Sequence, residues 1–299
     1  MKAFYCHHFV LPLPETHRFP MAKYRMLHER VATHAAAWGI ELIEPEAAGD
    51  ADLLRVHSAD YIRRMTTGQA VDQDMRRIGF PWSLQMIERS RRSAGGTMAA
   101  LRVALAGGGI AVNLAGGTHH AGYDRGGGYC VFNDSVIAAR HVQNLGLVAR
   151  VLVIDLDVHQ GNGTAELCAD DDSVFTFSMH AARNYPAIKP ASDLDVGLPD
   201  GTGDAEYLDA LARYLPQAME RARADAVIYL AGADPFFGDR LGHLALTKAG
   251  LAERDRQVIS VCRRQGLAMA ISMAGGYAAA VEDIVDIHLE TVRLAASIT

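Results

Sequence analysis

The sequence contains few cysteines and no long apolar run, and each absence excludes a class of protein. Its four cysteines are scattered singly, without a C-x-x-C pair, at Cys6, Cys130, Cys168 and Cys262. Such spacing predicts reduced thiols rather than a disulfide framework. No apolar stretch reaches the roughly 18 residues of a membrane span, and the first residues lack the apolar core of a secretion signal. We therefore expect a cytoplasmic protein without a membrane span.

Positive charge is also scarce. The 29 Lys and Arg residues are outnumbered by 35 Asp and Glu residues, which gives a formal net charge of -6. This balance argues against a nucleic acid or an anionic membrane as partner, because both are held through clustered positive charge. The 49% of hydrophobic residues still provide ample material for a core.

Two common catalytic signatures are missing as well. There is no G-x-S-x-G elbow, so serine hydrolase chemistry has no visible nucleophile. The glycine run Gly126-Gly-Gly128 lacks the Lys-Ser/Thr pair and the helix start of a phosphate-binding P-loop. The chemistry of the chain must therefore reside in other motifs.

What the sequence does contain is a regular alternation of apolar strand patterns with helical patterns. Strands are expected at 2–6, 40–44, 110–115, 151–154, 174–179, 226–231 and 267–273. Helices are expected at 23–38, 83–106 with a glycine stop at 107–109, 207–224, 246–265 and 280–296. This alternation predicts an α/β fold in which a mostly parallel sheet carries helices on both faces. Because no linker or repeat is visible, we expect a single domain over residues 1–299.

The stretch 150–163 is the most informative. It starts as an uninterrupted apolar strand, typical of strands buried on both faces, and continues with Asp155, Asp157 and His159 at every second position. If the extended geometry persists, the three side chains project from one side, about 6 to 7 Å apart. Two such neighbours can bind a metal together with a ligand from elsewhere. The simpler interpretation is that Asp and Asn after a strand form turns or helix caps.

Four segments share one pattern, in which an apolar strand is followed by small residues and then by reactive side chains. They are 115–120, 154–159, 230–234 and 273–277, and their reactive residues are His119, His120, Asp155, Asp157, His159, Asp234 and Tyr277. Because the carboxyl ends of parallel strands share one edge of a sheet, we expect these side chains to meet there. Taken singly, the two histidines could be a loop pair, Asp234 an N-cap before Pro235, and Tyr277 a core phenol.

The ordered motifs resemble the zinc-dependent histone deacetylases and their bacterial acetoin-utilisation and acetylpolyamine amidohydrolase relatives. The matching pieces are Gly117-Thr-His-His-Ala121, Gly128-Tyr-Cys-Val-Phe-Asn-Asp134, Asp155-Leu-Asp-Val-His159, Gly232-Ala-Asp234 and Gly275-Gly-Tyr277. The phrases Asp124-Arg-Gly-Gly-Gly-Tyr-Cys130 and His159-Gln-Gly-Asn-Gly163 look most like the class IV branch. The resemblance covers the chain from about Arg18 to its end and implies the arginase/deacetylase fold.

By this resemblance the metal ligands are Asp157, His159 and Asp234. Two carboxylates and one imidazole suit Zn2+, and Fe2+ is not excluded. The paired histidines, His119 and His120, would take a proton from the attacking water and later deliver one to the leaving amine.

The resemblance also implies partners for the two histidines. Asp155 would orient His119, and Asn162 stands where relatives pair the second histidine with Asp or Asn. A neutral partner raises the pKa of an imidazole less than a carboxylate does, so His120 is predicted to be the neutral one that acts as base. Tyr277 would donate its hydroxyl to the tetrahedral oxyanion.

Further implied positions bind the substrate and a structural cation. Tyr129 and Leu241 would line the acyl-lysine channel, and the carbonyl of Gly128 would accept the substrate amide. A monovalent cation, K+, would lie near Asp155 and Ser178.

The implied activity is hydrolysis of an acyl amide, acetyl or longer, on a lysine side chain or a related amine. An acylated lysine of a peptide or protein and a free acylated amine such as an acetylated polyamine are both open as substrates, because the loop 181–192 matches no known pattern. One alternative is an arginase-like ureohydrolase with two metals, for which Asp239 stands five residues after Asp234. Another is a non-catalytic module that binds acyl-lysine. The oligomeric state is left open.

Overall fold

A parallel sheet forms the centre of the computed structural model, which describes residues 1–14, 16–107 and 109–298. In this part of the chain the strands are β1 (Lys2–Phe4), β2 (Glu41–Ile43), β3 (Ile110–Asn113), β4 (Val151–Asp155), β5 (Val174–Ala181), β6 (Leu194–Leu198), β7 (Ala226–Leu230) and β8 (Ala268–Ser272). Their order across the sheet is β2-β1-β3-β8-β7-β4-β5-β6, and every neighbouring pair is parallel. The predicted α/β fold is therefore confirmed.

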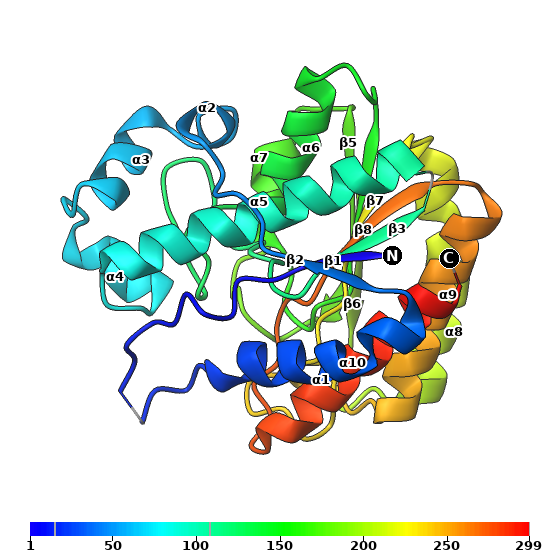
Figure 1. Ribbon diagram of the computed structural model, residues 1–299. Helices are drawn as coiled ribbons and strands as arrows, with labels where there is room; N and C mark the ends of the chain where they lie inside the picture. The colour runs from blue at the N-terminus through cyan, green and yellow to red at the C-terminus, as the bar shows by residue number, and fades with distance from the viewer. Residues whose placement is uncertain (15, 108, 299) are drawn as a thin grey trace.

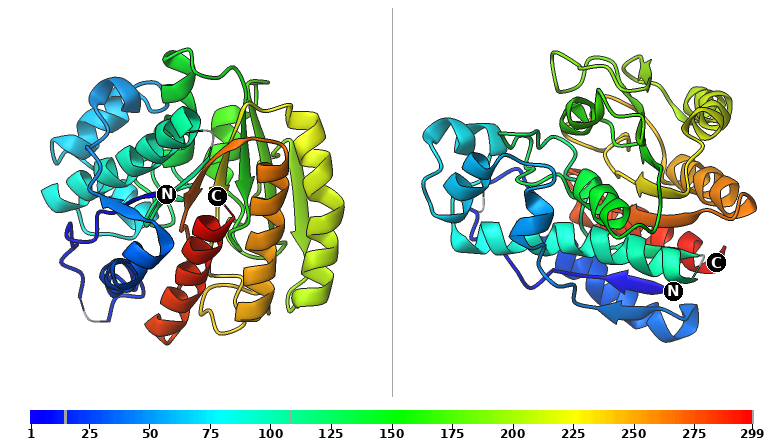
Figure 2. Two further views of the ribbon diagram at one scale, coloured as in Figure 1. Left: turned by 45° about the vertical axis from the view of Figure 1, so that its right-hand side comes forward. Right: turned by 90° about the horizontal axis from the view of Figure 1, so that it is seen from above.

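Helices cover both faces of the sheet, as Figures 1 and 2 show. They are α1 (Ala22–Trp38), α2 (Asp50–Leu53), α3 (Ala59–Thr66), α4 (Asp72–Ile78), α5 (Leu84–Gly107), α6 (Asp134–Asn144), α7 (Asn162–Cys168), α8 (Asp204–Ala222), α9 (Lys248–Arg264) and α10 (Val281–Ser297). On one face α8, α9, α10 and α1 pack in succession, and on the other α5 packs against the central strands and against α6. None of the helices in the described residues combines the length and the apolar character needed to cross a bilayer.

The apolar run of β4 explains why the sheet needs both layers. Leu152 and Ile154 belong to the core beneath α8, α9 and α10, whereas Val151 and Val153 belong to the core beneath α5 and α6. Successive side chains of a strand point to opposite faces, so an uninterrupted apolar strand is stable only between two helical layers.

The strands that precede the four reactive segments are β3, β4, β7 and β8, and they are neighbours in the sheet, in the order β3-β8-β7-β4. Their carboxyl ends therefore lie side by side at one edge. This adjacency, which the sequence could not specify, places the four segments within reach of each other.

Several elements differ from the sequence-based expectation. The edge strand β6 was not predicted because Asp195 and Gly197 break its apolar pattern, and α6, which begins at Asp134, was not predicted either. The short helices α2 and α4 were not predicted either. The helix expected at 83–106 ends at Gly107, and Gly108 lies outside the described residues.

Candidate metal and catalytic site

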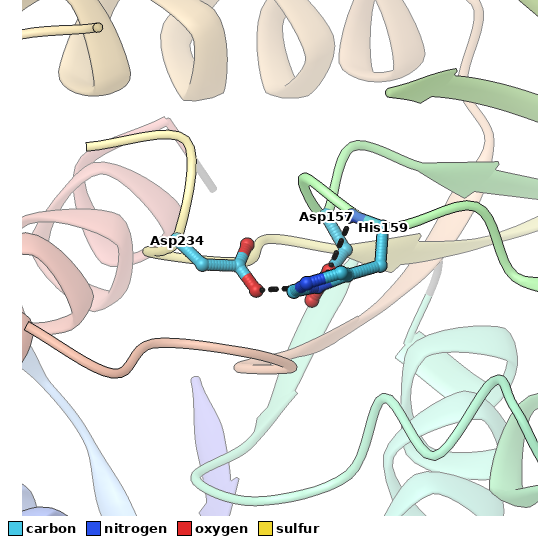
Figure 3. A group of neighbouring side chains, drawn as sticks. All are labelled: Asp157, His159 and Asp234. Atoms are coloured by element: carbon cyan, nitrogen blue, oxygen red, sulfur yellow. Dashed lines mark hydrogen bonds and ion pairs between the residues drawn. The ribbon is translucent and has the colours of Figure 1, made fainter. Parts of the chain in front are cut away.

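Asp157, His159 and Asp234 come together at the edge formed by β4 and β7 (Figure 3). One ligand atom from each lies within 4.8 Å of the others. Nδ1 of His159 is 3.1 Å from Oδ1 of Asp157 and 3.2 Å from Oδ2 of Asp234. All three side chains are buried, so the two acids and the imidazole form one enclosed cluster.

The cluster fits a divalent cation. Oδ2 of Asp234 is buried and, apart from its ion pair with Nδ1 of His159, has no polar partner among the described residues. Burial and the neighbouring charge of Asp157 raise the pKa of Asp234 to about 7, which shows the cost of holding both carboxylates charged. A side chain on Gly275 would clash with both carboxylates, so glycine keeps the space between them open. A cation bound there would compensate the buried charge.

The backbone after β4 bends instead of continuing as a strand. Oδ1 of Asp155 accepts the amide of Asp157 at 3.2 Å, and Oδ1 of Asp157 accepts the amide of His159 at 3.0 Å. The extended geometry therefore ends at Asp155 and does not continue to His159, because these local side-chain bonds compete with the strand. Asp155 faces the paired histidines, whereas Asp157 and His159 face Asp234.

The paired histidines form a chain of buried hydrogen bonds beside this cluster. Nδ1 of His119 lies 2.6 Å from Oδ2 of Asp155, and Nδ1 of His120 lies 2.7 Å from Oδ1 of Asn162. The two Nε2 atoms are 3.1 Å apart. If each Nδ1–H donates to its oxygen, the bond between the Nε2 atoms requires one protonated Nε2, in a charged ring, and one unprotonated Nε2, in a neutral ring.

The pKa values of the two rings move in opposite directions. Burial lowers the pKa of His119, but the carboxylates of Asp155 and Asp157 outweigh it and raise that pKa to about 9. Burial and the charges of His119 and His159 lower the pKa of His120 well below its ordinary value. In this arrangement His119 carries the charge and His120 is neutral.

A cavity of about 430 Å³ leads from the surface to the site, and its lining includes Gly128, Tyr129, Leu241 and Tyr277. The ring of Tyr277 lies 6.5 Å from that of His159 and 5.7 Å from that of Tyr129. Burial and the charges of Asp157 and Asp234 raise the pKa of Tyr277 well above its ordinary value, so its hydroxyl stays protonated. Four of the predicted substrate and oxyanion residues thus share one cavity.

The wall formed by Gly128 and Tyr129 has an unusual backbone. Both residues have positive φ, 50° and 66°, and a side chain on Gly128 would clash with His120. The amide of Gly128 donates to the carbonyl of Arg77 at 3.0 Å, and that of Tyr129 donates to Ile78 at 2.8 Å. The turn is therefore fixed against the end of α4, and it keeps Tyr129 at the channel despite its strained φ.

Comparison with known proteins places this chain in a family. The profile of the histone deacetylase domain matches residues 17–292. The chain belongs to the histone deacetylase family. The match to this domain and to proteins named histone deacetylases supports the activity class of a hydrolase that removes acyl groups.

Relatives of this histone deacetylase family member come from distant organisms. An uncharacterized protein of Picosynechococcus sp. is 44% identical, covering 94% of this chain and 93% of the relative. Histone deacetylase 2 of Arabidopsis thaliana is 34% identical over 79% of this chain, which spans 63% of that protein. Histone deacetylase 1 of Homo sapiens is 30% identical, and the match covers 85% of this chain and 56% of the human protein. The crystal structure of the HDA15 HD domain has the same fold, with a TM-score of 0.83, 22% identity and coverage of 99% of this chain and 90% of that one.

Some residues of this deacetylase site were missed by sequence reasoning. Tyr185, in the loop 181–192, packs edge-on to His120 with ring centroids 4.8 Å apart. Asn184 ties this loop to the channel, since its amide donates to the carbonyl of Leu241 at 2.6 Å and its oxygen accepts the amide of His243 at 2.9 Å. The sequence carried no signal for this loop because it reaches the site only through tertiary contacts.

The motif residues Asn133 and Asp134 hold the loop that carries the paired histidines. Asp134 accepts the amides of Gly117 at 3.0 Å and Thr118 at 2.7 Å. Asn133 donates from its side chain to the carbonyl of Ala121 at 3.1 Å and caps α6. Their role is to fix the backbone on both sides of His119 and His120.

A buried arginine supports the loops that carry Asp157 and Asp234. Arg254 of α9 is fully buried and donates from Nη1 to the carbonyls of Leu156 at 3.2 Å and Gly232 at 2.7 Å. Asp255 accepts its Nε–H at 2.8 Å. Sequence analysis did not single out this pair, since it looks like ordinary charge on a helix.

The predicted monovalent cation site involves two residues in register. Asp155 on β4 lies directly opposite Ser178 on β5. Oγ of Ser178 is 2.9 Å from Nδ1 of His180. The two residues are thus neighbours, and the cation itself stays a prediction.

Proposed function

We propose that this protein is a metal-dependent hydrolase that removes an acyl group from the amine of a lysine side chain or a related amine. The observation that carries the proposal is the chain Asp155, His119, His120 and Asn162 beside the buried cluster of two acids and one imidazole. A proton relay adjoining a cation site is the arrangement that metal-assisted hydrolysis requires.

Asp157, His159 and Asp234 would hold the metal, Zn2+ or Fe2+. When bound, the ion polarises the substrate carbonyl and acidifies the attacking water. Gly275 donates its amide to Oδ2 of Asp157 at 2.8 Å, which orients that ligand.

The histidines handle the protons. Nε2 of neutral His120 accepts the proton of the attacking water, while Asp155 and the neighbouring carboxylates keep His119 charged. The relay then returns a proton to the leaving amine. Because Asn162 is uncharged, it holds the ring of His120 without raising its pKa as far as a carboxylate would.

Tyr277 donates its phenolic hydrogen to the oxyanion that forms at the carbonyl. Losing one such donor costs about 3 kcal/mol of transition-state stabilisation. Tyr129 and Leu241 hold the acyl-amine chain, and the carbonyl of Gly128 accepts its amide hydrogen. A K+ ion near Asp155 and Ser178 would complete the supporting structure.

The contacts of Asp239 argue against the two-metal ureohydrolase. Its Oδ1 accepts the amides of Leu241 at 2.8 Å and Gly242 at 2.9 Å, and its Oδ2 accepts the amide of Tyr277 at 2.6 Å. Both oxygens thus shape the channel, and among the described residues Asp239 is not part of the group that could hold a metal, which is Asp157, His159 and Asp234. A non-catalytic binding module would have no use for the relay of His119 and His120.

Turnover of acyl-lysine peptides tests the proposal. We expect cleavage with Zn2+ or Fe2+ supplied, its loss with a chelator, and a decrease in kcat of about 100-fold or more for Tyr277→Phe. Tyr214→Phe on α8, which removes the same hydroxyl away from the cavity, serves as the control. Binding of these peptides without cleavage under any metal condition would instead favour the binding module.

A further inference from the structure

The arginines are the only acidic or basic side chains, histidines apart, among the described residues that line the catalytic cavity. They are Arg76, Arg77 and Arg183, and no aspartate or glutamate lines it. The whole chain has a formal charge of -6, so this local sign is opposite to that of the protein. Such a cavity mouth concentrates anions and repels cations.

Two of these arginines have no counter-ion. Arg183 is paired with Asp200 at 2.7 Å, but Arg76 and Arg77 form no ion pair with any described residue. On the neighbouring helix α3, by contrast, Arg63 and Arg64 both pair with Asp60. The uncompensated charge at the mouth thus comes from Arg76 and Arg77.

Their position is fixed by the channel wall itself. Both residues are exposed and lie in the last turn of α4, which ends at Gly79 in a left-handed conformation. The carbonyl of Arg77 accepts the amide of Gly128 at 3.0 Å. The backbone of α4 is therefore joined to the wall formed by Gly128 and Tyr129, and Arg76 and Arg77 line the same cavity as that wall.

Acylation removes the charge of the reacting amine. The charge on the rest of the substrate therefore decides whether the arginines attract or repel it. An acylated polyamine keeps at least one ammonium group, whose pKa near 10 leaves it charged at neutral pH. An acyl-lysine next to acidic residues, or a free acyl-lysine with its own carboxylate, brings a negative charge instead. The two arginines attract the second kind and repel the first.

We propose that Arg76 and Arg77 form an anion-recognition subsite that selects acylated amines with a nearby carboxylate and disfavours acylated polyamines. The inference rests on the proposed function and narrows its substrate class. The simpler role for arginines in the last turn of a helix is to complement the helix dipole. That role predicts an effect on stability but none on substrate choice.

Matched peptides separate the two roles. The substrates are three acetyl-lysine peptides, in which the acetyl-lysine is flanked by aspartate, serine or lysine, and three small molecules, free acetyl-lysine, its amide and N-acetylputrescine. The kcat/KM of each is measured at low and at high salt. We expect the wild type to favour the aspartate peptide over the lysine peptide by about 5-fold or more, since exposed ion pairs change such ratios by up to about 5-fold each. This preference should shrink at high salt. If free acetyl-lysine is cleaved faster than its amide, the carboxylate that the subsite recognises is the one on free acetyl-lysine.

The charge-reversed variant gives the decisive comparison. Arg76→Glu/Arg77→Glu should reverse the order, so that the lysine peptide and N-acetylputrescine become better substrates than the aspartate peptide when each kcat/KM is divided by that of the serine peptide. Arg264→Glu, in the last turn of α9, removes the same helix-terminal charge away from the cavity and should keep the wild-type order. Thermal unfolding verifies that each variant is folded.

Each outcome decides a separate question. If the wild type cleaves the serine peptide but shows no preference among the charged ones, the subsite is refuted and the hydrolase stands. If the preference exists but is the same in the double variant, Arg76 and Arg77 do not cause it and the proposal is overturned. If no peptide or amine is cleaved, the proposed function itself fails, and this inference fails with it.

Discussion

At the scale of single residues, glycines leave space for the side chains of the site, and buried contacts keep histidines in one protonation state. Glycine at 275 leaves space between Asp157 and Asp234, and glycine at 128 leaves space for His120. These positions could be read from the sequence as motif glycines. Their physical reason appears only once the carboxylates and the imidazole are in place.

The buried contacts of His57 require its ring to be neutral. Its Nδ1 lies 2.8 Å from the carbonyl of Gly122 and its Nε2 lies 3.0 Å from the amide of Asn133. Nε2 must accept this amide, so the ring has to be neutral to hold the loop on both sides. Burial lowers the pKa of His57 to about 4.

We therefore expect acid to destabilise the fold through His57. Its folded pKa lies below its unfolded value, so the unfolded chain binds the proton more readily and stability falls as pH drops from about 6.5 toward 4. Between pH 7.5 and 5 the loss from this group is about 2 kcal/mol. Urea unfolding at both pH values should show a smaller acid loss in His57→Gln than in the wild type. The control His34→Gln, at an exposed position of α1, should keep the wild-type loss.

At the scale of elements, the strands whose carboxyl ends carry the site could be predicted from the sequence. The strands before the reactive segments were recognisable because apolar runs buried on both faces are distinctive. The edge strand β6, the helix α4 and the loop 181–192 were not, because their sequences are polar and tertiary contacts fix them. Arg76, Arg77 and Tyr185 lie on these elements, so the catalytic centre was more predictable than the mouth of the cavity.

The hydrogen bonds of Arg254 connect α9 to the segments after β4 and β7 that carry the proposed metal ligands, and they give a testable prediction. Arg254 bonds to the backbone after β4 and β7, and Asp255 is further held by Tyr229 at 2.5 Å and Thr291 at 2.5 Å. Removing one partner of a buried ion pair leaves the other uncompensated and costs about 3–5 kcal/mol. We expect Arg254→Leu to lose this much in urea unfolding and to weaken metal binding as well.

A double-mutant cycle separates the ion pair from the backbone contacts. Arg254→Leu/Asp255→Asn should lose clearly less than the sum of the two single variants, because it leaves no unpaired charge. Losses that add would show that the pair is not coupled. Unchanged metal affinity in Arg254→Leu would show that its bonds to Leu156 and Gly232 do not position the ligands.

At the scale of the whole molecule, the metal site should make the stability of the fold depend on the ion. The ligands come from segments after β4 and β7, which the unfolded chain does not hold together. A ligand that binds only the folded state stabilises it by about 2.7 kcal/mol at 100 times its Kd. For a chain of this size that is an increase of several degrees in Tm.

The thermal test compares the protein with chelator and with Zn2+ in excess. We expect the ion to raise the Tm of the wild type and to leave that of Asp234→Asn nearly unchanged, because an amide oxygen without charge is a poorer ligand for the cluster. The same substitution removes a buried carboxylate whose pKa is already raised, so with chelator present the variant should be at least as stable as the wild type. An equal increase in Tm for both proteins would mean that the ion stabilises the fold at another place, and the assignment of Asp157, His159 and Asp234 as its ligands would have to be abandoned.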